Sequence, residues 1–200
     1  MASNNQRRGR KSRMLEKLQW LMPSGFRRQR AWADPDDHGS GVLHEQRLQF
    51  VQEFVQLRPE TNRRIGDLGC GAGALVQRLL GLPSTTFVLG LDVSGDALLR
   101  VRQHPRSAQA IAAGRLQVQA NSFMQVDLRP WCLDTLVLLE TIEHLPPQRL
   151  KVLERQLFEH RHAHQILIST PNADYNPLLG LSPGDLRHPD HQFEWGRSQF

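Results

Sequence analysis

Short apolar runs alternate with stretches of helical periodicity along most of the sequence. Five runs have the length and apolar content of buried strands, and they cover residues 64–70, 87–91, 115–119, 134–139 and 165–170. Helical spacing of apolar residues marks the segments 43–51, 74–80, 97–102 and 148–160. Strands that alternate with helices predict an α/β fold, in which helices cover both faces of a parallel sheet. Ligands of such sheets bind beyond the carboxyl ends of the strands.

A glycine-rich turn follows the first predicted strand. It reads Asp67-Leu68-Gly69-Cys70-Gly71-Ala72-Gly73, and the helix predicted over 74–80 begins directly after it. The glycines let the backbone turn sharply and let a ligand approach the main chain, while the helix N-terminus offers unpaired N–H groups. Their spacing differs from the dinucleotide fingerprint. Asp92, at the end of the next apolar run, is placed as a ribose-binding carboxylate would be.

This order of strand, acidic glycine loop, helix, strand and acid resembles that of class I S-adenosylmethionine methyltransferases, which have a Rossmann-like fold. The resemblance implies S-adenosylmethionine rather than NAD as the cofactor. A tight turn that binds nothing also needs glycine, so a purely structural loop stays open as the alternative.

An acidic segment with a histidine follows the fourth predicted strand. If a helical turn begins after Leu139, then Glu140, Glu143 and His144 project from one face of it. Carboxylates held that close repel each other unless a proton or a cation lies between them. Carboxylate oxygens suit Mg²⁺ or Mn²⁺, whereas an imidazole shifts the preference toward later transition metals. This segment alone leaves open an exposed helix start, where the helix dipole favours acidic residues.

Three segments in the second half of the chain closely resemble the Hua-enhancer-type RNA 2′-O-methyltransferases, which methylate the ribose 2′-hydroxyl at the 3′ end of small RNAs. They are residues 140–145, the run Ile168-Ser169-Thr170-Pro171-Asn172-Ala173-Asp174-Tyr175-Asn176, and the run Arg187-His188-Pro189-Asp190-His191-Gln192-Phe193-Glu194-Trp195. Residues 43–51 also look like the family's segment before the glycine loop. The resemblance therefore runs from about residue 43 to the end of the sequence.

The resemblance implies a metal site and a reaction. It makes Glu140, Glu143, His144 and His191 the ligands of Mg²⁺ (or Mn²⁺), with Glu143 and His144 also in catalytic roles. The metal would hold the 2′- and 3′-hydroxyls of the terminal nucleotide, which would require an RNA with a free 3′ end. Coordination lowers the pKa of a hydroxyl and fixes it in line with the methyl group. Whether His144 is a ligand or the base that takes the proton stays open.

The resemblance also implies the residues that bind S-adenosylmethionine. Asp67, Gly69, Gly71 and Gly73 would line the methionine end of the cofactor. The ribose and the adenine would lie beside Asp92, Ser94, Asn121 and Ser122.

Charge is distributed unevenly along the chain. Residues 1–33 contain nine Lys or Arg and a single acid, Glu16, whereas the remaining 16 basic and 19 acidic residues nearly balance. We expect residues 1–41 to form a basic, flexible arm and linker, and residues 42–200 to form the methyltransferase domain. The arm suits attraction to RNA phosphates, with Trp20 available for stacking. An Arg-rich start is also typical of organelle-targeting peptides.

Other features limit the interpretation. No apolar run reaches the length that crosses a bilayer, so we expect no membrane partner. Cys70 and Cys132 are too few for a disulfide framework, which favours a reducing, cytoplasmic location. His160, His162 and His164 are expected on a solvated helix end rather than at a metal. In a bacterium the resemblance allows an RNA-repair kinase-phosphatase as a partner.

One departure from the family pattern keeps two other functions open. Methyltransferases of this class usually add a helix and two antiparallel strands after the fifth strand region, so we expect a C-terminally incomplete domain. A noncatalytic RNA-binding remnant is the first alternative. The second is a methyltransferase for another acceptor, although base amino-methyltransferases carry an Asn/Asp-Pro-Pro-aromatic motif after the fourth strand and this chain has Glu140 to His144 there.

Overall fold

The computed structural model describes residues 41–58, 60, 63–159 and 163–200. Its central layer is a five-stranded sheet in the order β3-β2-β1-β4-β5. Every pair of neighbouring strands is parallel. The strands are β1 (Arg64–Leu68), β2 (Phe87–Asp92), β3 (Leu116–Ala120), β4 (Thr135–Leu139) and β5 (Gln165–Ser169). The five predicted strands and their parallel arrangement are thereby confirmed, with ends that shift by at most two residues.

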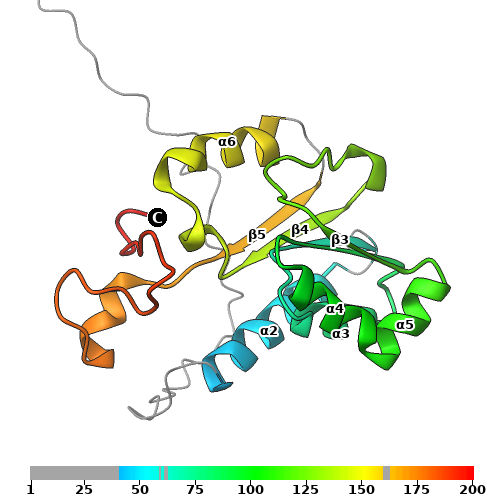
Figure 1. The fold of residues 1–200 in the computed structure, drawn as a ribbon, viewed down its shortest axis with the longest axis horizontal. Helices are drawn as coiled ribbons and strands as arrows, with labels where there is room; N and C mark the ends of the chain where they lie inside the picture. The colour runs from blue at the N-terminus through cyan, green and yellow to red at the C-terminus, as the bar shows by residue number, and fades with distance from the viewer. Residues whose placement is uncertain (1–40, 59, 61–62, 160–162) are drawn as a thin grey trace, which may run out of the picture.

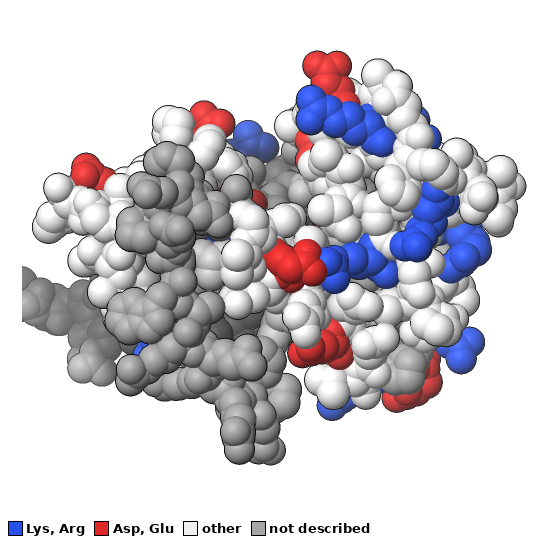
Figure 2. Space-filling view, turned by 90° about the horizontal axis from the view of Figure 1, so that it is seen from below, with Lys and Arg blue, Asp and Glu red and all other residues white. Residues whose placement is uncertain are grey.

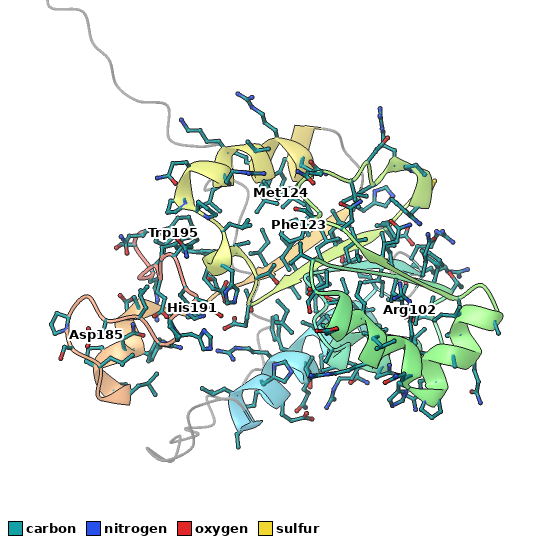
Figure 3. The ribbon with its side chains drawn as sticks, viewed as in Figure 1. Arg102, Phe123, Met124, Asp185, His191 and Trp195 are labelled. Carbon is teal, nitrogen blue, oxygen red and sulfur yellow. The ribbon has the colours of Figure 1, made fainter. Side chains whose placement is uncertain are left out.

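Helices cover the two faces of the sheet unequally. One face carries α2 (Gly41–Gln56), α3 (Ala74–Leu80), α4 (Gly95–Gln103) and α5 (Pro105–Ala112), and the opposite face carries α6 (Leu150–Glu154), as Figure 1 shows. The core is accordingly divided in two. The larger helical layer packs through residues such as Val51, Val76 and Leu98. The α6 side packs through Leu153 and the apolar loop residues Phe123 and Met124, which Figure 3 labels.

Two helical segments differ from the sequence prediction. Helix α5 was not predicted. Its buried residues, Ser107 and Ala110, are small, and its large aliphatic side chain, Ile111, is exposed. The single helix predicted over 148–160 is broken in the structure. A 3₁₀ turn (Pro147–Arg149) leads into α6, and a π turn (Arg155–Glu159) follows it.

The chain beyond β5 lies next to the carboxyl ends of β4 and β5 (Figure 1). It contains a 3₁₀ helix (Ala173–Leu179) and then runs back, so that Asn172 and Trp195 form an isolated bridge. Strand β5 is at the edge of the sheet, and each of its residues is partly exposed. Of the helices in the described ranges, none combines the length and the apolarity that crossing a membrane requires.

Candidate functional site

The glycine loop joins β1 to α3 and takes backbone conformations that favour glycine. Gly69, Gly71 and Gly73 have φ values of 88°, 51° and 87°. The main-chain N–H groups of Gly69 and Cys70 donate to the carbonyl of Leu91, at 2.8 and 2.9 Å, which ties the loop to the end of β2. A Cβ atom on Gly73 would lie 2.8 Å from Val101, whereas a Cβ on Gly71 would meet nothing within 4 Å. The loop is therefore packed closely on one side and open at Gly71.

Asp92 is oriented by the same loop. Its Oδ2 accepts a hydrogen bond of 2.7 Å from the Gly71 N–H, and its Oδ1 accepts one of 2.8 Å from the Ser94 N–H. The N–H of Asn121 donates to the Asp92 carbonyl at 2.9 Å, so the segment after β3 lies beside it. The Asn121 side chain in turn accepts from the N–H of Ser122. The four residues expected near the cofactor's ribose and adenine thus lie together at the carboxyl ends of β2 and β3.

Asp67 is buried beneath the glycine loop with an unsatisfied carboxylate oxygen. The whole residue is 2% exposed, and Oδ2 has no hydrogen-bond partner. Burial, and then the nearby charge of Asp92, raises the pKa of Asp67 to about 7. A buried acceptor without a donor is costly, so this position fits a ligand that carries N–H groups or positive charge. The loop, Asp67 and Asp92 together fit an S-adenosyl cofactor.

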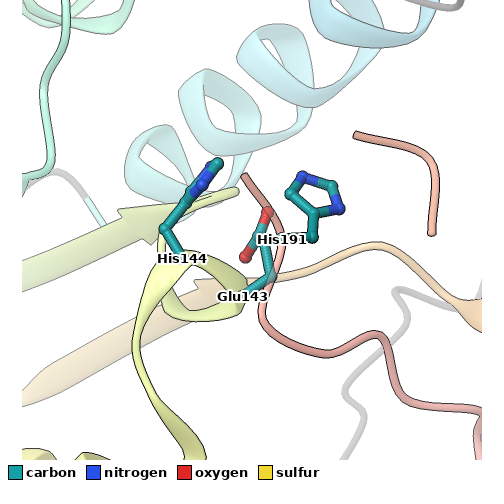
Figure 4. A group of neighbouring side chains, drawn as sticks. All are labelled: Glu143, His144 and His191. Carbon is teal, nitrogen blue, oxygen red and sulfur yellow. The ribbon is translucent and has the colours of Figure 1, made fainter. Parts of the chain in front are cut away.

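A second group lies after β4, where Glu143, His144 and His191 converge. Each offers one ligand atom, and these atoms all lie within 4.8 Å of one another (Figure 4). Glu143 and His144 belong to a 3₁₀ turn (Ile142–His144), which the fully buried Ile142 anchors in the core. His191 comes from the segment beyond β5, and the backbone N–H of Gln192 donates to the Glu143 carbonyl at 2.7 Å.

Glu143 is buried and incompletely satisfied. The whole residue is 0% exposed; Oε2 accepts from the Thr170 hydroxyl at 3.1 Å, and Oε1 has no partner. Burial raises the pKa of Glu143 to about 7, and the charge of Glu140 adds to this effect. A divalent cation would supply the missing partner and favour the ionised carboxylate. The donor set therefore fits a metal ion of the Mg²⁺ or Mn²⁺ type or a borderline one.

The histidines of the group differ in their surroundings. The His144 and His191 rings have centroids 5.0 Å apart, and the exposed ring of His188 lies 5.6 Å from that of His191. Burial lowers the pKa of His144, and His191 lowers it further. The lowered pKa favours the neutral form of His144, which is the form that binds a metal or accepts a proton.

Glu140 does not lie in the group of three. Its Oε2 is 3.0 Å from Nη2 of Arg47 on α2, and its Oε1 accepts from the hydroxyl of Ser169 on β5. The helical turn considered directly after Leu139 begins only at Ile142, so it does not place Glu140 on one face with Glu143 and His144. Glu140 has a φ of 51°, and its N–H donates to the Ser169 carbonyl, which continues the β4–β5 ladder by one residue.

The two parts of the site adjoin each other through Thr141. Its hydroxyl donates to the Leu68 carbonyl, and a Cβ added to Gly69 would lie 2.6 Å from its Cγ2. The glycine loop and the group around Glu143 are therefore neighbours at one edge of the sheet. This edge carries all twelve residues that the sequence assigns to the site: Asp67, Gly69, Gly71, Gly73, Asp92, Ser94, Asn121, Ser122, Glu140, Glu143, His144 and His191.

Sequence reasoning assigned no role to several residues that hold this site together. Arg47, Ser169 and Thr170 contact the two glutamates, and Glu194 contacts His191. Each lies inside a segment that resembles the family, and this resemblance is the one feature of the sequence that could have pointed to them. Their contacts depend on how distant segments pack. Residues 1–40 of the basic arm and His160 to His162 lie outside the described residues. The third histidine of that group, His164, lies near the opposite end of β4, where its backbone N–H donates to the Asp134 carbonyl.

Comparison with known proteins now decides the family. Residues 65–160 match a family model described as a methyltransferase domain. The crystal structure of the methyltransferase domain of bacterial CtHen1 (CN) is 32% identical, has a TM-score of 0.63, and aligns over 78% of this chain and 80% of its own. The chain belongs to the Hen1 family of class I methyltransferases. Its Rossmann-like fold and its expected Hua-enhancer-type family are thus confirmed.

Other Hen1 relatives are longer than this chain. The crystal structure of small RNA methyltransferase HEN1 has a TM-score of 0.68 at 26% identity and aligns over 88% of this chain but 22% of its own. The curated small RNA 2′-O-methyltransferase of Xenopus tropicalis is 32% identical over 164 residues, which are 79% of this chain and 44% of that protein. This chain therefore spans less than half the length of the curated relatives that it matches.

Proposed function

We propose that this chain transfers a methyl group from S-adenosylmethionine to the 2′-hydroxyl of the 3′-terminal nucleotide of RNA, with the help of a divalent metal ion. The observation that carries the proposal is the convergence of Glu143, His144 and His191 beside the glycine loop. Membership of the Hen1 family supports it, because its curated relatives are named small RNA 2′-O-methyltransferases.

The glycine loop and the two aspartates, Asp67 and Asp92, would hold S-adenosylmethionine. The open backbone at Gly71 admits the cofactor, and Asp67 faces its positively charged methionine end. Asp92, already fixed by two main-chain N–H groups, keeps lone pairs that can accept from the ribose hydroxyls. Ser94, Asn121 and Ser122 border the space for the nucleoside.

The metal would be held by Glu143, His144 and His191, with Glu140 as the fourth ligand. A divalent ion bound by these residues would lower the pKa of a ribose hydroxyl and orient it. Glu143 is pre-placed by burial and by Thr170, which limits the rearrangement that binding requires. Because burial lowers its pKa and favours the neutral imidazole, His144 can either ligate or take the proton that the hydroxyl releases. The reaction forms the ribose O–CH₃ bond and breaks the sulfur–CH₃ bond, which leaves S-adenosylhomocysteine.

The basic arm would add affinity for RNA. We assign residues 1–41 to an arm that precedes the methyltransferase domain at 42–200, and this arm would contact phosphates without reading sequence. Within the domain, Figure 2 shows Lys and Arg interspersed with Asp and Glu on the face of α2 to α5. The RNA terminus itself would enter at the carboxyl ends of the strands, beside His144 and His188.

A transfer assay tests the proposal. Radiolabelled S-adenosylmethionine is offered with a short RNA that ends in a normal ribose or in a 2′-deoxyribose, with Mn²⁺ or with chelator. We expect label only in the normal RNA and only with metal. Glu143→Gln should lose transfer, whereas the same chemical change on the surface of α2, Glu53→Gln, should retain it.

Two outcomes would overturn the proposal. Equal label in both RNAs would mean that another group is methylated. Binding of RNA without transfer under any condition would favour a noncatalytic binding protein.

A further inference from the structure

Glu194 carries a buried carboxylate that lies directly behind His191. Its side chain is 1% exposed, and its Oε1 lies 2.6 Å from Nδ1 of His191. The same oxygen accepts a hydrogen bond of 2.7 Å from the backbone N–H of Arg187. Oε2 accepts one of 2.7 Å from Nδ2 of Asn176 and lies 3.8 Å from Nε of Arg187. Every close partner of this carboxylate is therefore an N–H group.

These partners are themselves fixed to the body of the domain. The guanidinium of Arg187 donates through Nε to the Asn176 side chain at 2.7 Å and through Nη2 to the carbonyl of Asn172 at 2.6 Å. Asn172 lies shortly after β5, beyond Thr170 and Pro171, and forms the bridge with Trp195. The segment that carries His191 is thus tied to the segment after β5 on both sides of Glu194.

The contact determines which nitrogen of His191 faces the site. An ionised carboxylate has no hydrogen to donate, and the N–H donors around Glu194 favour that form, so Nδ1 of His191 must carry the hydrogen of this contact. The remaining nitrogen, Nε2, is then the atom with a free lone pair. His191 lies on the segment beyond β5, beside Glu143 and His144, as Figures 3 and 4 show.

We propose that Glu194 is a positioning residue that holds His191 as the Nδ1–H tautomer with Nε2 directed at the group formed with Glu143 and His144. The inference deepens the proposed function and rests on it, because it concerns how one ligand of the metal is prepared. A charged acceptor behind a ligating histidine fixes the ring and raises its basicity. Loss of such a partner typically weakens metal binding by about 10- to 100-fold.

The first test uses the metal-free protein and does not depend on activity. Long-range ¹H–¹⁵N NMR of the imidazole rings at about pH 8.5, where an ordinary histidine is neutral, distinguishes the two tautomers. The His191 signals are assigned by their loss in His191→Gln. We expect the Nδ1–H form in the wild type and a mixture of tautomers in Glu194→Gln. A predominant Nε2–H form in the wild type would overturn the proposal.

The second test measures affinity for the metal alone. Mn²⁺ binding, followed by the loss of the free-ion electron paramagnetic resonance signal, should be weakened about 10-fold or more in Glu194→Gln. Asp174→Asn is the matched control, because Asp174 accepts from the Arg197 N–H in the same segment but does not contact His191. Unchanged Mn²⁺ affinity in Glu194→Gln would contradict the role of Glu194.

The two tests separate this inference from the proposed function. If the wild-type protein fails to bind Mn²⁺, the metal part of the proposed function fails, while the tautomer measurement still decides the role of Glu194. If Glu194→Gln does not fold, the wild-type tautomer alone decides it. An Nδ1–H tautomer together with weakened metal binding supports both.

Discussion

Nη2 of Arg47 lies 3.0 Å from Oε2 of Glu140, so an ion pair joins helix α2 to the carboxyl end of strand β4. The side chains of Arg47 and Glu140 are 27% and 20% exposed, which leaves the pair only partly screened by water. Arg47 therefore places a positive charge at the border of the proposed metal site. It also occupies the carboxylate that the family resemblance assigns to the metal.

Removal of this charge should strengthen metal binding. Arg47→Gln frees the Glu140 carboxylate and removes a cation that repels the incoming metal, so we expect Mn²⁺ affinity to rise about threefold, in keeping with the strength of partly exposed ion pairs. Titration calorimetry with Mn²⁺ measures the change. Arg78→Gln breaks the ion pair between Arg78 on α3 and Glu45 on α2 and should leave the Mn²⁺ affinity unaltered. Weaker Mn²⁺ binding in Arg47→Gln would show that Arg47 supports the site instead of competing for it.

Two glycines of the cofactor loop should respond differently to substitution. Gly73→Ala adds a Cβ against Val101 at a positive φ and should lower the free energy of unfolding by about 2–4 kcal/mol. Gly71→Ala meets no protein atom and should cost about 1–2 kcal/mol for backbone strain alone. Because its methyl group enters the proposed cofactor space, it should weaken S-adenosylhomocysteine binding about tenfold or more, a loss of about 1.4 kcal/mol. Urea unfolding and calorimetry measure the two effects, and intact cofactor binding in Gly71→Ala would place the cofactor elsewhere.

Asp67 should make the stability of the cofactor-free chain depend on pH. Its pKa is raised from 3.8 to about 7, first by burial and then by Asp92, so the folded chain keeps a proton that the unfolded chain releases at lower pH. Asp67 does not lower the free energy of unfolding below about pH 4, where both states hold the proton, and it lowers that free energy increasingly as the pH rises to about 7. Asp67→Asn should therefore stabilise the chain by on the order of 2–4 kcal/mol at pH 8 and by almost nothing at pH 4. Urea unfolding at both values tests this, and a pH-independent difference between variant and wild type would refute it.

Glu143 should lower the stability of the metal-free chain and be required for metal binding. Its carboxylate is buried with an unsatisfied oxygen and has a pKa of about 7, so Glu143→Gln should raise the melting temperature of the metal-free chain at pH 8. The same variant should lose the stabilisation that Mn²⁺ gives the wild type, which is about 2.7 kcal/mol at one hundred times the dissociation constant. Thermal melts with Mn²⁺ or chelator compare the two proteins. An equal response to Mn²⁺ in both would remove Glu143 from the metal site.

The fold was largely predictable because β2 and β4 are nearly continuous apolar runs, while β3 alternates Leu116 and Val118 with glutamines. Parallel strands buried on both faces need no polar alternation, and runs such as Thr135–Leu139 stand out from the surrounding sequence. Helix α5 escaped prediction because its buried residues, Ser107 and Ala110, are small and its Ile111 is exposed. The helical turn considered directly after Leu139 begins later, at Ile142, because the hydrogen bond from Glu140 to Ser169 continues the β4–β5 ladder by one residue.

Only the site residues that lie together in one sequence segment, or that the family resemblance supplies, could be predicted. The glycine loop and the pair Glu143 and His144 are local in sequence, and family resemblance supplied His191. The partners that prepare these residues are a matter of packing. Arg47 reaches Glu140 from the first described helix, and Thr170 reaches Glu143 from the end of β5. No periodicity in the sequence records such contacts between distant segments.

The position of the transferred methyl group tests the central claim most directly. RNA incubated with this chain, Mn²⁺ and S-adenosylmethionine that carries a deuterated methyl group is digested to nucleosides, and mass spectrometry locates the label. We predict a 2′-O-methylated nucleoside that derives only from the 3′ terminus and that is absent with Glu143→Gln. Label on a base or on an internal ribose, or no label while the RNA is bound, would contradict the account.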